Sequence, residues 1–139
     1  MSLDEHYSAD LTALALEIGV DAQALNEHQT LVVGEVTLSL SPVAGPSGGA
    51  IQCACKVGPL PPHPSTDMLR LLLQANTLGP ITTGSSFGLQ LGADDILLEQ
   101  RYSIDTPPAA LARACRAQCE TSLILAAALA QGLPLTHAV

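Results

Sequence analysis

The first apolar residues of the chain are spaced as on one face of a helix. They recur every three or four positions, which predicts a helix running from Ser2 or Leu3 to Ile18. Acidic residues early in this segment suit the positive N-terminal end of a helix, and Gly19 ends it. The next segment, residues 21–28, is predicted to be a loop or a single helical turn. The side chains expected to face inward are Leu11, Leu14, Ala15 and Ile18.

Apolar and polar residues then alternate with the period of a strand. A short first strand leads into a tight connection at residues 32–35, and a strictly alternating second strand covers 36–41. The glycine-rich segment 42–49 predicts a hairpin loop. A third strand is expected over residues 50–57, so that the three strands form a meander. On this third strand one face carries Ile51, Cys53, Cys55 and Val57.

A proline-rich connector, residues 58–64, precedes a short apolar helix over residues 68–76. Nearly every side of this helix is apolar, so it must be covered on more than one side. A small domain has few layers with which to cover it. The simplest cover is a second copy of the chain, and we therefore predict an obligate dimer built around Leu69, Leu72 and Leu73.

Two more strands and a long helix complete the pattern. The strands cover residues 81–91 and 96–104, and the helix begins with Thr106 as its cap and ends near Gln131. The predicted order is helix, three strands, helix, two strands, helix. This order indicates the α+β class, with a mostly antiparallel twisted sheet flanked by helices. One domain is expected over residues 1–139.

Composition and charge limit the partners of such a domain. Hydrophobic residues make up 47% of the chain, which is enough for a core, while aromatic residues make up only 2%. The net charge is −8, which disfavours nucleic acid and anionic membranes and favours a basic or mostly apolar polypeptide. The acidic start is unlike a signal peptide, and the longest apolar run is too short to span a bilayer. We therefore expect a cytoplasmic protein.

The four cysteines form two pairs, Cys53 with Cys55 and Cys115 with Cys119. The first pair shares a strand face and the second a helix face, but neither has the C-x-x-C spacing of a zinc knuckle. Cysteine is also among the residue types most often buried. We predict four buried, reduced thiols without metal, with a metal site, a disulfide or a redox role as the alternatives.

No cluster of residues has the arrangement of an active site. The segment 84–88 fits G-x-S-x-G by letter with Ser86 at its centre, but it runs into a strand, whereas a nucleophile elbow needs strand, sharp turn and helix. A glycine-rich strand start is the better interpretation. We predict no enzyme and no cofactor. The rival hypothesis, an enzyme or small-molecule carrier, would use Cys53, Cys55 and Ser86. The histidines lie far apart in the sequence, at His6, His28, His63 and His137.

Three sequence segments, taken in their order along the chain, resemble segments of a known family. They are residues 71–76, with leucines followed by Ala-Asn, the glycine-rich segment 84–89, and the strand-like segment 96–102. Together with the order of elements they resemble the class I type III secretion chaperones, the Tir-chaperone family. The likeness covers roughly residues 11–129.

The resemblance implies a small acidic homodimer in the bacterial cytoplasm, without ATPase activity. Such chaperones bind a non-globular segment near the N-terminus of a secreted effector and keep it competent for export. In this family the second helix, with help from the fourth strand, usually forms the dimer interface. The residues that the resemblance assigns to this interface are Met68, Leu69, Leu72, Leu73, Asn76, Phe87 and Leu89.

The resemblance also places apolar patches for the effector on the first helix and the first three strands. The inward residues of the first helix must pack on the sheet, so the strands supply the better candidates. These are Leu31, Val33, Val36, Leu38, Leu40 and Ile51, some of which must belong to the core. Two other protein-binding functions remain open: a regulatory dimer that sequesters a transcription factor or another chaperone, and a purely structural dimerisation module.

Overall fold

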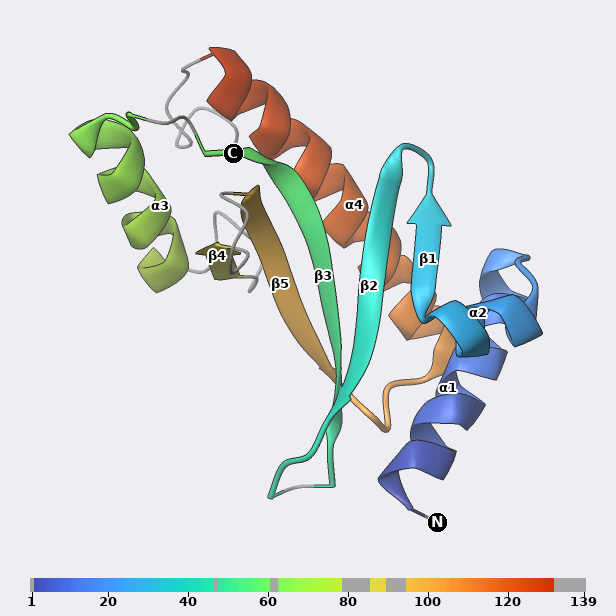
Figure 1. Cartoon of the computed structure of the whole chain (residues 1–139). Helices are drawn as coiled ribbons and strands as arrows, with labels where there is room; N and C mark the ends of the chain where they lie inside the picture. The colour runs from blue at the N-terminus through green and yellow to red at the C-terminus, as the bar shows by residue number, and fades with distance from the viewer. Residues whose placement is uncertain (1, 47, 61–62, 79–85, 90–94, 132–139) are drawn as a thin grey trace. The chain divides into compact units, whose positions relative to one another are not determined.

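The computed structural model describes residues 2–46, 48–60, 63–78, 86–89 and 95–131. Within them the chain has the α+β class that the sequence predicts, with one helix more than expected (Figure 1). None of these helices is long and apolar enough to cross a membrane. In chain order the elements are α1 (Leu3–Ile18), α2 (Ala22–His28), β1 (Thr30–Val33), β2 (Val36–Val43), β3 (Ala50–Pro59), α3 (Thr66–Leu78), β4 (Ser86–Leu89), β5 (Asp95–Ser103) and α4 (Pro108–Gln131).

The strands form one antiparallel five-stranded sheet in the order β1-β2-β3-β5-β4, with β1 and β4 at its edges. The residues group into two compact units. Unit 1 consists of Met1–Cys53 and Arg101–Ala117, and unit 2 of Ala54–Gln100 and Gln118–Val139. Three elements, β3, β5 and α4, contribute residues to both units. Whether the chain is a single domain stays a prediction.

In unit 1, α1 has the bounds that its apolar spacing predicts. The Ser2 hydroxyl caps it by accepting the N–H of Glu5 at 3.2 Å. Gly19 ends it with φ at +89°, a conformation that a side chain would strain. Three of the four inward residues are buried and Ile18 is partly buried.

The second helix, α2, is longer than the predicted loop or single turn. The Asp21 carboxylate accepts the N–H groups of Gln23 and Ala24, so the chain had an N-cap that the apolar pattern did not reveal. Only Leu25 is buried on this helix. Polar contacts complete its attachment to α1, because the Asn26 side chain bonds to the hydroxyls of Ser8 and Thr12.

The core of unit 1 follows from strand alternation. β1 pairs with β2 in a register that sets Leu31 opposite Leu38, and both side chains are fully buried. The α4 residues of this unit lie close to the strands: the Tyr102 hydroxyl donates to the Ala114 carbonyl, and the thiols of Cys53 and Cys115 are hydrogen-bonded. The helix begins at Pro108, and the carbonyl of Pro107 accepts its first bond, so the cap lies one residue after the predicted Thr106.

In unit 2, α3 is capped by Ser65, whose hydroxyl accepts the N–H of Met68 at 3.0 Å. The α4 residues of this unit bond to the strands through buried polar side chains. Gln118 donates to the Leu98 carbonyl at 3.2 Å, and Ser122 to the Lys56 carbonyl at 3.5 Å. The predicted fourth strand is confirmed over β4, while its remaining positions at 81–85 and 90–91 lie outside the described residues.

Alkaline titration should reveal the packing of Tyr7 in unit 1. Its hydroxyl donates to Gln29, and burial, aided by the nearby Cys53, raises its pKa from 10.0 to about 12. A raised folded-state pKa means that the stabilisation is complete below pH 10 and is lost as the pH rises towards 12. We expect wild-type melting temperature to fall more steeply over this range than that of Tyr7→Phe, followed by circular dichroism. Parallel curves would contradict the assignment.

Candidate functional site

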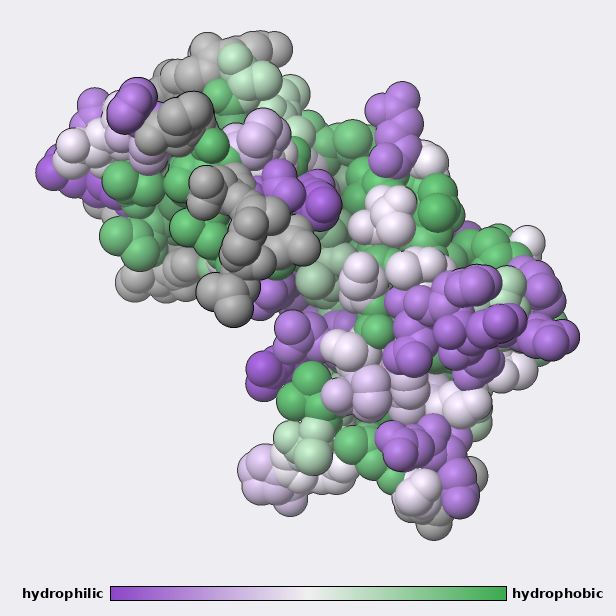
Figure 2. Space-filling view, viewed as in Figure 1, coloured by the Kyte–Doolittle hydropathy of each residue, from purple (hydrophilic) through white to green (hydrophobic). Residues whose placement is uncertain are grey.

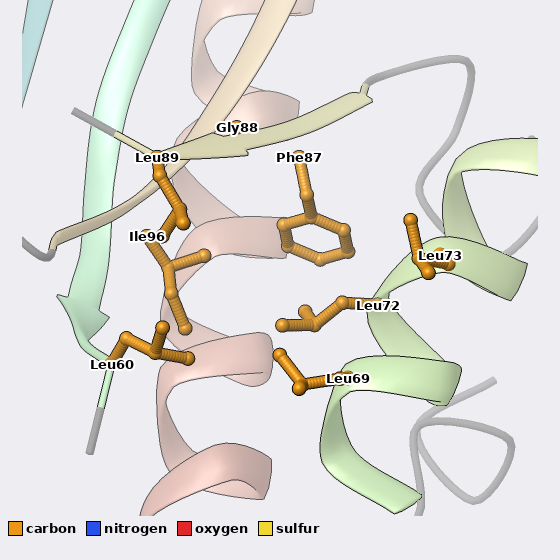
Figure 3. Close-up of a pocket in the computed structure, with 8 residues that line it drawn as sticks. All are labelled: Leu60, Leu69, Leu72, Leu73, Phe87, Gly88, Leu89 and Ile96. Atoms are coloured by element: carbon orange, nitrogen blue, oxygen red, sulfur yellow. The ribbon is translucent and has the colours of Figure 1, made fainter. Parts of the chain in front are cut away.

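An apolar hollow of about 270 Å³ lies within unit 2, between α3 and β4 (Figure 3). Its lining contains no charged side chain, so it suits an apolar partner. In Figure 3, Leu69 and Leu72 extend from α3 toward the β4 side chains, while Leu60 lies across the hollow. The lining consists of Leu60, Leu69, Leu72, Leu73, Phe87, Gly88, Leu89 and Ile96.

Three leucines at this hollow remain exposed. Leu69 exposes 41% of its surface, Leu73 69% and Leu89 56%, and apolar atoms gather over this part of unit 2 in Figure 2. Burying a leucine contributes about 1.5–3 kcal/mol, so the exposed surface favours association. By contrast, the described surface of α1 and α2 in unit 1 is largely polar in the same view.

The structure brings together five of the seven residues predicted for the dimer interface. Met68 is partly buried on α3 but does not line the hollow, and the Asn76 side chain lies outside the description. The sequence interpretation missed Leu60 and Ile96. Ile96 could have been found from the sequence, because it is one of the alternating apolar residues of β5. This strand pairs with β4, and Ile96 lies opposite Leu89. The five that line the hollow are Leu69, Leu72, Leu73, Phe87 and Leu89.

A second surface lies in unit 1, at the sheet edge formed by β1. The Leu40 N–H donates to the Gln29 carbonyl at 2.9 Å, which fixes the residues of β1 that face β2. Bonded and non-bonded pairs alternate in an antiparallel ladder, so Thr30 and Val32 direct their N–H and C=O groups away from β2. The strand order leaves this side of β1 as an edge of the sheet. Val32 also exposes 61% of its surface.

The side chains predicted to contact the effector lie mostly in the core. Because strand residues point alternately to opposite faces, the apolar alternate positions of β2 and β3 fill the covered face. The opposite face in unit 1 carries exposed Thr37, Ser39 and Ser41 beside Val32. The sequence interpretation missed Val32, whose alternation with Leu31 was the available signal. Of the six predicted residues, Val33 is partly buried, and the buried ones are Leu31, Val36, Leu38, Leu40 and Ile51.

Comparison with known families identifies the chain. The profile of the Tir chaperone protein (CesT) family matches residues 11–125. The chain belongs to the Tir chaperone protein (CesT) family. The family resemblance predicted from the sequence is therefore confirmed. No match was found among curated proteins.

Two solved structures share the fold of this CesT-family chain. The crystal structure of the ExsC-ExsE complex matches with a TM-score of 0.66 and 17% identity, covering 96% of this chain and 98% of that one. The HopA1-SchA chaperone-effector complex matches with a TM-score of 0.65 and 14% identity, covering 86% of this chain and 91% of that one. At these identities the comparisons establish the architecture.

The residues of the rival enzyme hypothesis, Cys53, Cys55 and Ser86, lie on strands β3 and β4 of this CesT-family chain. All four cysteines are buried, as predicted. Burial raises the pKa of the Cys55 thiol, although Ser122 and Gln118 partly offset the effect, so this thiol is a poor nucleophile at neutral pH. A hydrogen bond with Cys53 lowers the pKa of Cys115, against an opposing effect of burial. Ser86 lies in β4 opposite Glu99, as a strand residue.

Stability measurements should separate the two faces of the β1–β2 hairpin. Leu38→Ala removes a fully buried side chain and should lower the free energy of unfolding by about 2–5 kcal/mol. Val32→Ala, on the exposed face of the same hairpin, should cost less than about 1 kcal/mol. Urea denaturation followed by circular dichroism measures both. Equal losses would contradict the assignment of faces.

Proposed function

We propose that this chain is a homodimeric, ATP-independent chaperone that acts in the bacterial cytoplasm. Its client is an extended segment near the N-terminus of a type III secreted effector, which it keeps competent for export. The proposal rests on membership of the CesT family across residues 11–125. The open edge of β1 and the apolar surface of unit 2 supply the two kinds of contact that this function needs.

The edge of β1 is suited to a client without folded structure. An extended chain can add a strand to a sheet edge, because main-chain hydrogen bonds then supply affinity. Thr30 and Val32 each direct one N–H and one C=O toward that edge. A client residue opposite Val32 would also contact its exposed side chain, so a small or branched apolar residue fits best there. Fixing a disordered segment carries an entropic cost, which the added contacts must exceed.

Charge favours the same kind of client. The net charge of −8 attracts a basic segment and repels other acidic chains. Such attraction acts on the rate of association more than on the final affinity. A basic, extended segment with alternate apolar residues therefore matches both the charge of the chain and the edge of β1.

The hollow between α3 and β4 supports the homodimer. A twofold dimer uses the same surface on both subunits, so this surface must be complementary to itself. Leu73, the most exposed of the three leucines, projects at the rim of the hollow. We infer that α3 of each subunit packs against α3 and β4 of its partner. The exposed leucines are then covered on the sides that one chain leaves open.

The regulatory alternative uses the same surfaces with a different client. A transcription factor or another chaperone would then occupy the edge instead of a secreted effector. Mass spectrometry of the proteins that co-purify with the native chain distinguishes these clients. A secreted protein bound through its N-terminal segment supports the export function, and a regulator as the sole partner contradicts it.

The dimer makes a specific prediction about α3. Leu73→Asp places a charge in what would be a dry interface, which should cost several kcal/mol of association free energy. In sedimentation experiments the wild type should have twice the chain mass of 14.3 kDa and the variant should be a folded monomer. The matched control is Leu16→Asp in unit 1, where the leucine exposes 79% of its surface and the dimer should persist. A folded Leu73→Asp dimer would rule out this interface.

The edge of β1 can be tested with the N-terminal segment of the captured secreted protein, by calorimetric titration. Val32→Pro removes an N–H that points away from β2, so it should spare the hairpin ladder. It should weaken client binding by at least roughly fivefold, since one strand hydrogen bond is lost. Val32→Ala keeps the donor and should weaken binding less. Equal losses in the two variants would refute recognition through the backbone, and both should leave the dimer intact.

A further inference from the structure

The direction of a client strand on β1 follows from the number of client residues that must be ordered. The outward groups of β1 are the N–H and C=O of Thr30 and of Val32. In an antiparallel pair the client residue opposite each of them exchanges two hydrogen bonds, so a stretch of three client residues uses all four groups. In a parallel pair the bonds are slanted, and the same four groups need a stretch of five. Each ordered residue costs conformational entropy, so antiparallel pairing is favoured.

The ends of β1 favour the short antiparallel stretch as well. The strand stops at Val33, where the turn of Gly34 and Glu35 leads into β2. At its other end it follows Gln29, whose φ of +55° lies outside the strand region. A parallel client would extend past Thr30 toward this bend, whereas the three residues of an antiparallel client stay beside the strand.

The antiparallel direction places the N-terminal side of the client stretch at the turn. The client residue two positions before the one opposite Val32 then lies beside Gly34 and Glu35. Strands lie about 4.8 Å apart and rise about 3.3 Å per residue, so a long basic side chain at that position can reach the turn. Glu35 is exposed and forms no ion pair with a described residue. The segment 1–55, which contains the whole β1–β2 hairpin, has acidic residues but no lysine or arginine.

We propose that the client strand runs antiparallel to β1 and carries a lysine or arginine two residues before the residue opposite Val32, where it pairs with Glu35. This inference rests on the proposed function, because it assumes that a client strand pairs with β1. Main-chain bonds alone do not select a sequence, and the charge adds a rule of order to them. A segment with the same residues in the reverse order presents its cation at the other end of β1. An exposed ion pair is weak, so it selects among clients and does not supply the main affinity.

The direction is tested by nuclear magnetic resonance with a short synthetic peptide. The peptide has a single valine, flanking threonines and one lysine two positions before the valine. A nitroxide label at its N-terminus should broaden the amide signal of Glu35 more than that of Gln29, and a label at its C-terminus should do the reverse. The opposite pattern would overturn the proposal.

The charge is tested by titrating this peptide and a second one, whose lysine lies two positions after the valine. At low salt the wild type should bind the first peptide about two- to fivefold more tightly. Glu35→Gln should abolish the preference, and high salt should reduce it. The matched control is Glu17→Gln, which removes the same charge from an exposed position of α1 and should keep the preference. Equal affinities in the wild type, or a preference that survives in Glu35→Gln, would show that Glu35 does not select the client.

Val32→Pro separates a failure of this inference from a failure of the proposed function. Both peptides, and the N-terminal segment of the captured secreted protein, should bind this variant more weakly than the wild type. If they do, but the direction or the charge preference is missing, only the inference fails. If no segment binds, or if Val32→Pro binds them as tightly as the wild type, recognition through the edge of β1 fails and the inference fails with it.

Discussion

The packing of α4 on β3 and β5 is the interaction on which both compact units depend. In unit 1 the Cys115 thiol of the helix bonds to Cys53 of β3. In unit 2, Gln118 and Ser122 donate to carbonyl groups of β5 and β3. These two polar side chains are almost fully buried, and each would cost about 1–3 kcal/mol without its partner. The helix is therefore held by specific hydrogen bonds as well as by apolar contact.

In unit 2 the described residues leave several leucines exposed. The apolar helix α3 has β4 beside it, but β4 is only four residues long and carries the glycine Gly88 between Phe87 and Leu89. Such a strand presents little surface, and leucines of α3 stay exposed around the hollow. The chain has no tryptophan and Phe87 is its one phenylalanine, so few large side chains are available to fill the space. The second copy that we propose would supply volume that the described residues of one chain lack.

The period of the apolar pattern was sufficient to predict α1, the three strands of the meander and α4. It was sufficient because the buried residues of α1 and α4 recur every three or four positions, and the strands alternate with one side covered. The pattern missed α2, whose formation rests on the Asp21 cap and on polar contacts with α1. It left open which face of β2 is exposed. In the structure the apolar residues of β2 mark the core, while the accessible groups of the β1 edge belong to the backbone. The residue type does not reveal whether a backbone N–H or C=O group is unpaired. Only the strand order and the register of pairing identify the open groups.

The open edge of β1 determines which chains can pair with the sheet. Open edges invite pairing with other chains, and proteins usually protect them with lysine, proline, bulges or a covering element. The residues of β1, Thr30–Val33, include no charge and no proline, and Val32 is exposed beside the open backbone groups. The strand is only four residues long, which limits edge-to-edge pairing between two copies of it. The edge of β1 is too short to pair well with a copy of itself, but its backbone N–H and C=O groups are open. It is therefore suited to a short strand that carries positive charge. Because main-chain bonds are common to all sequences, such an edge would accept clients through their extended shape, with Val32 and the acidic surface supplying the selection.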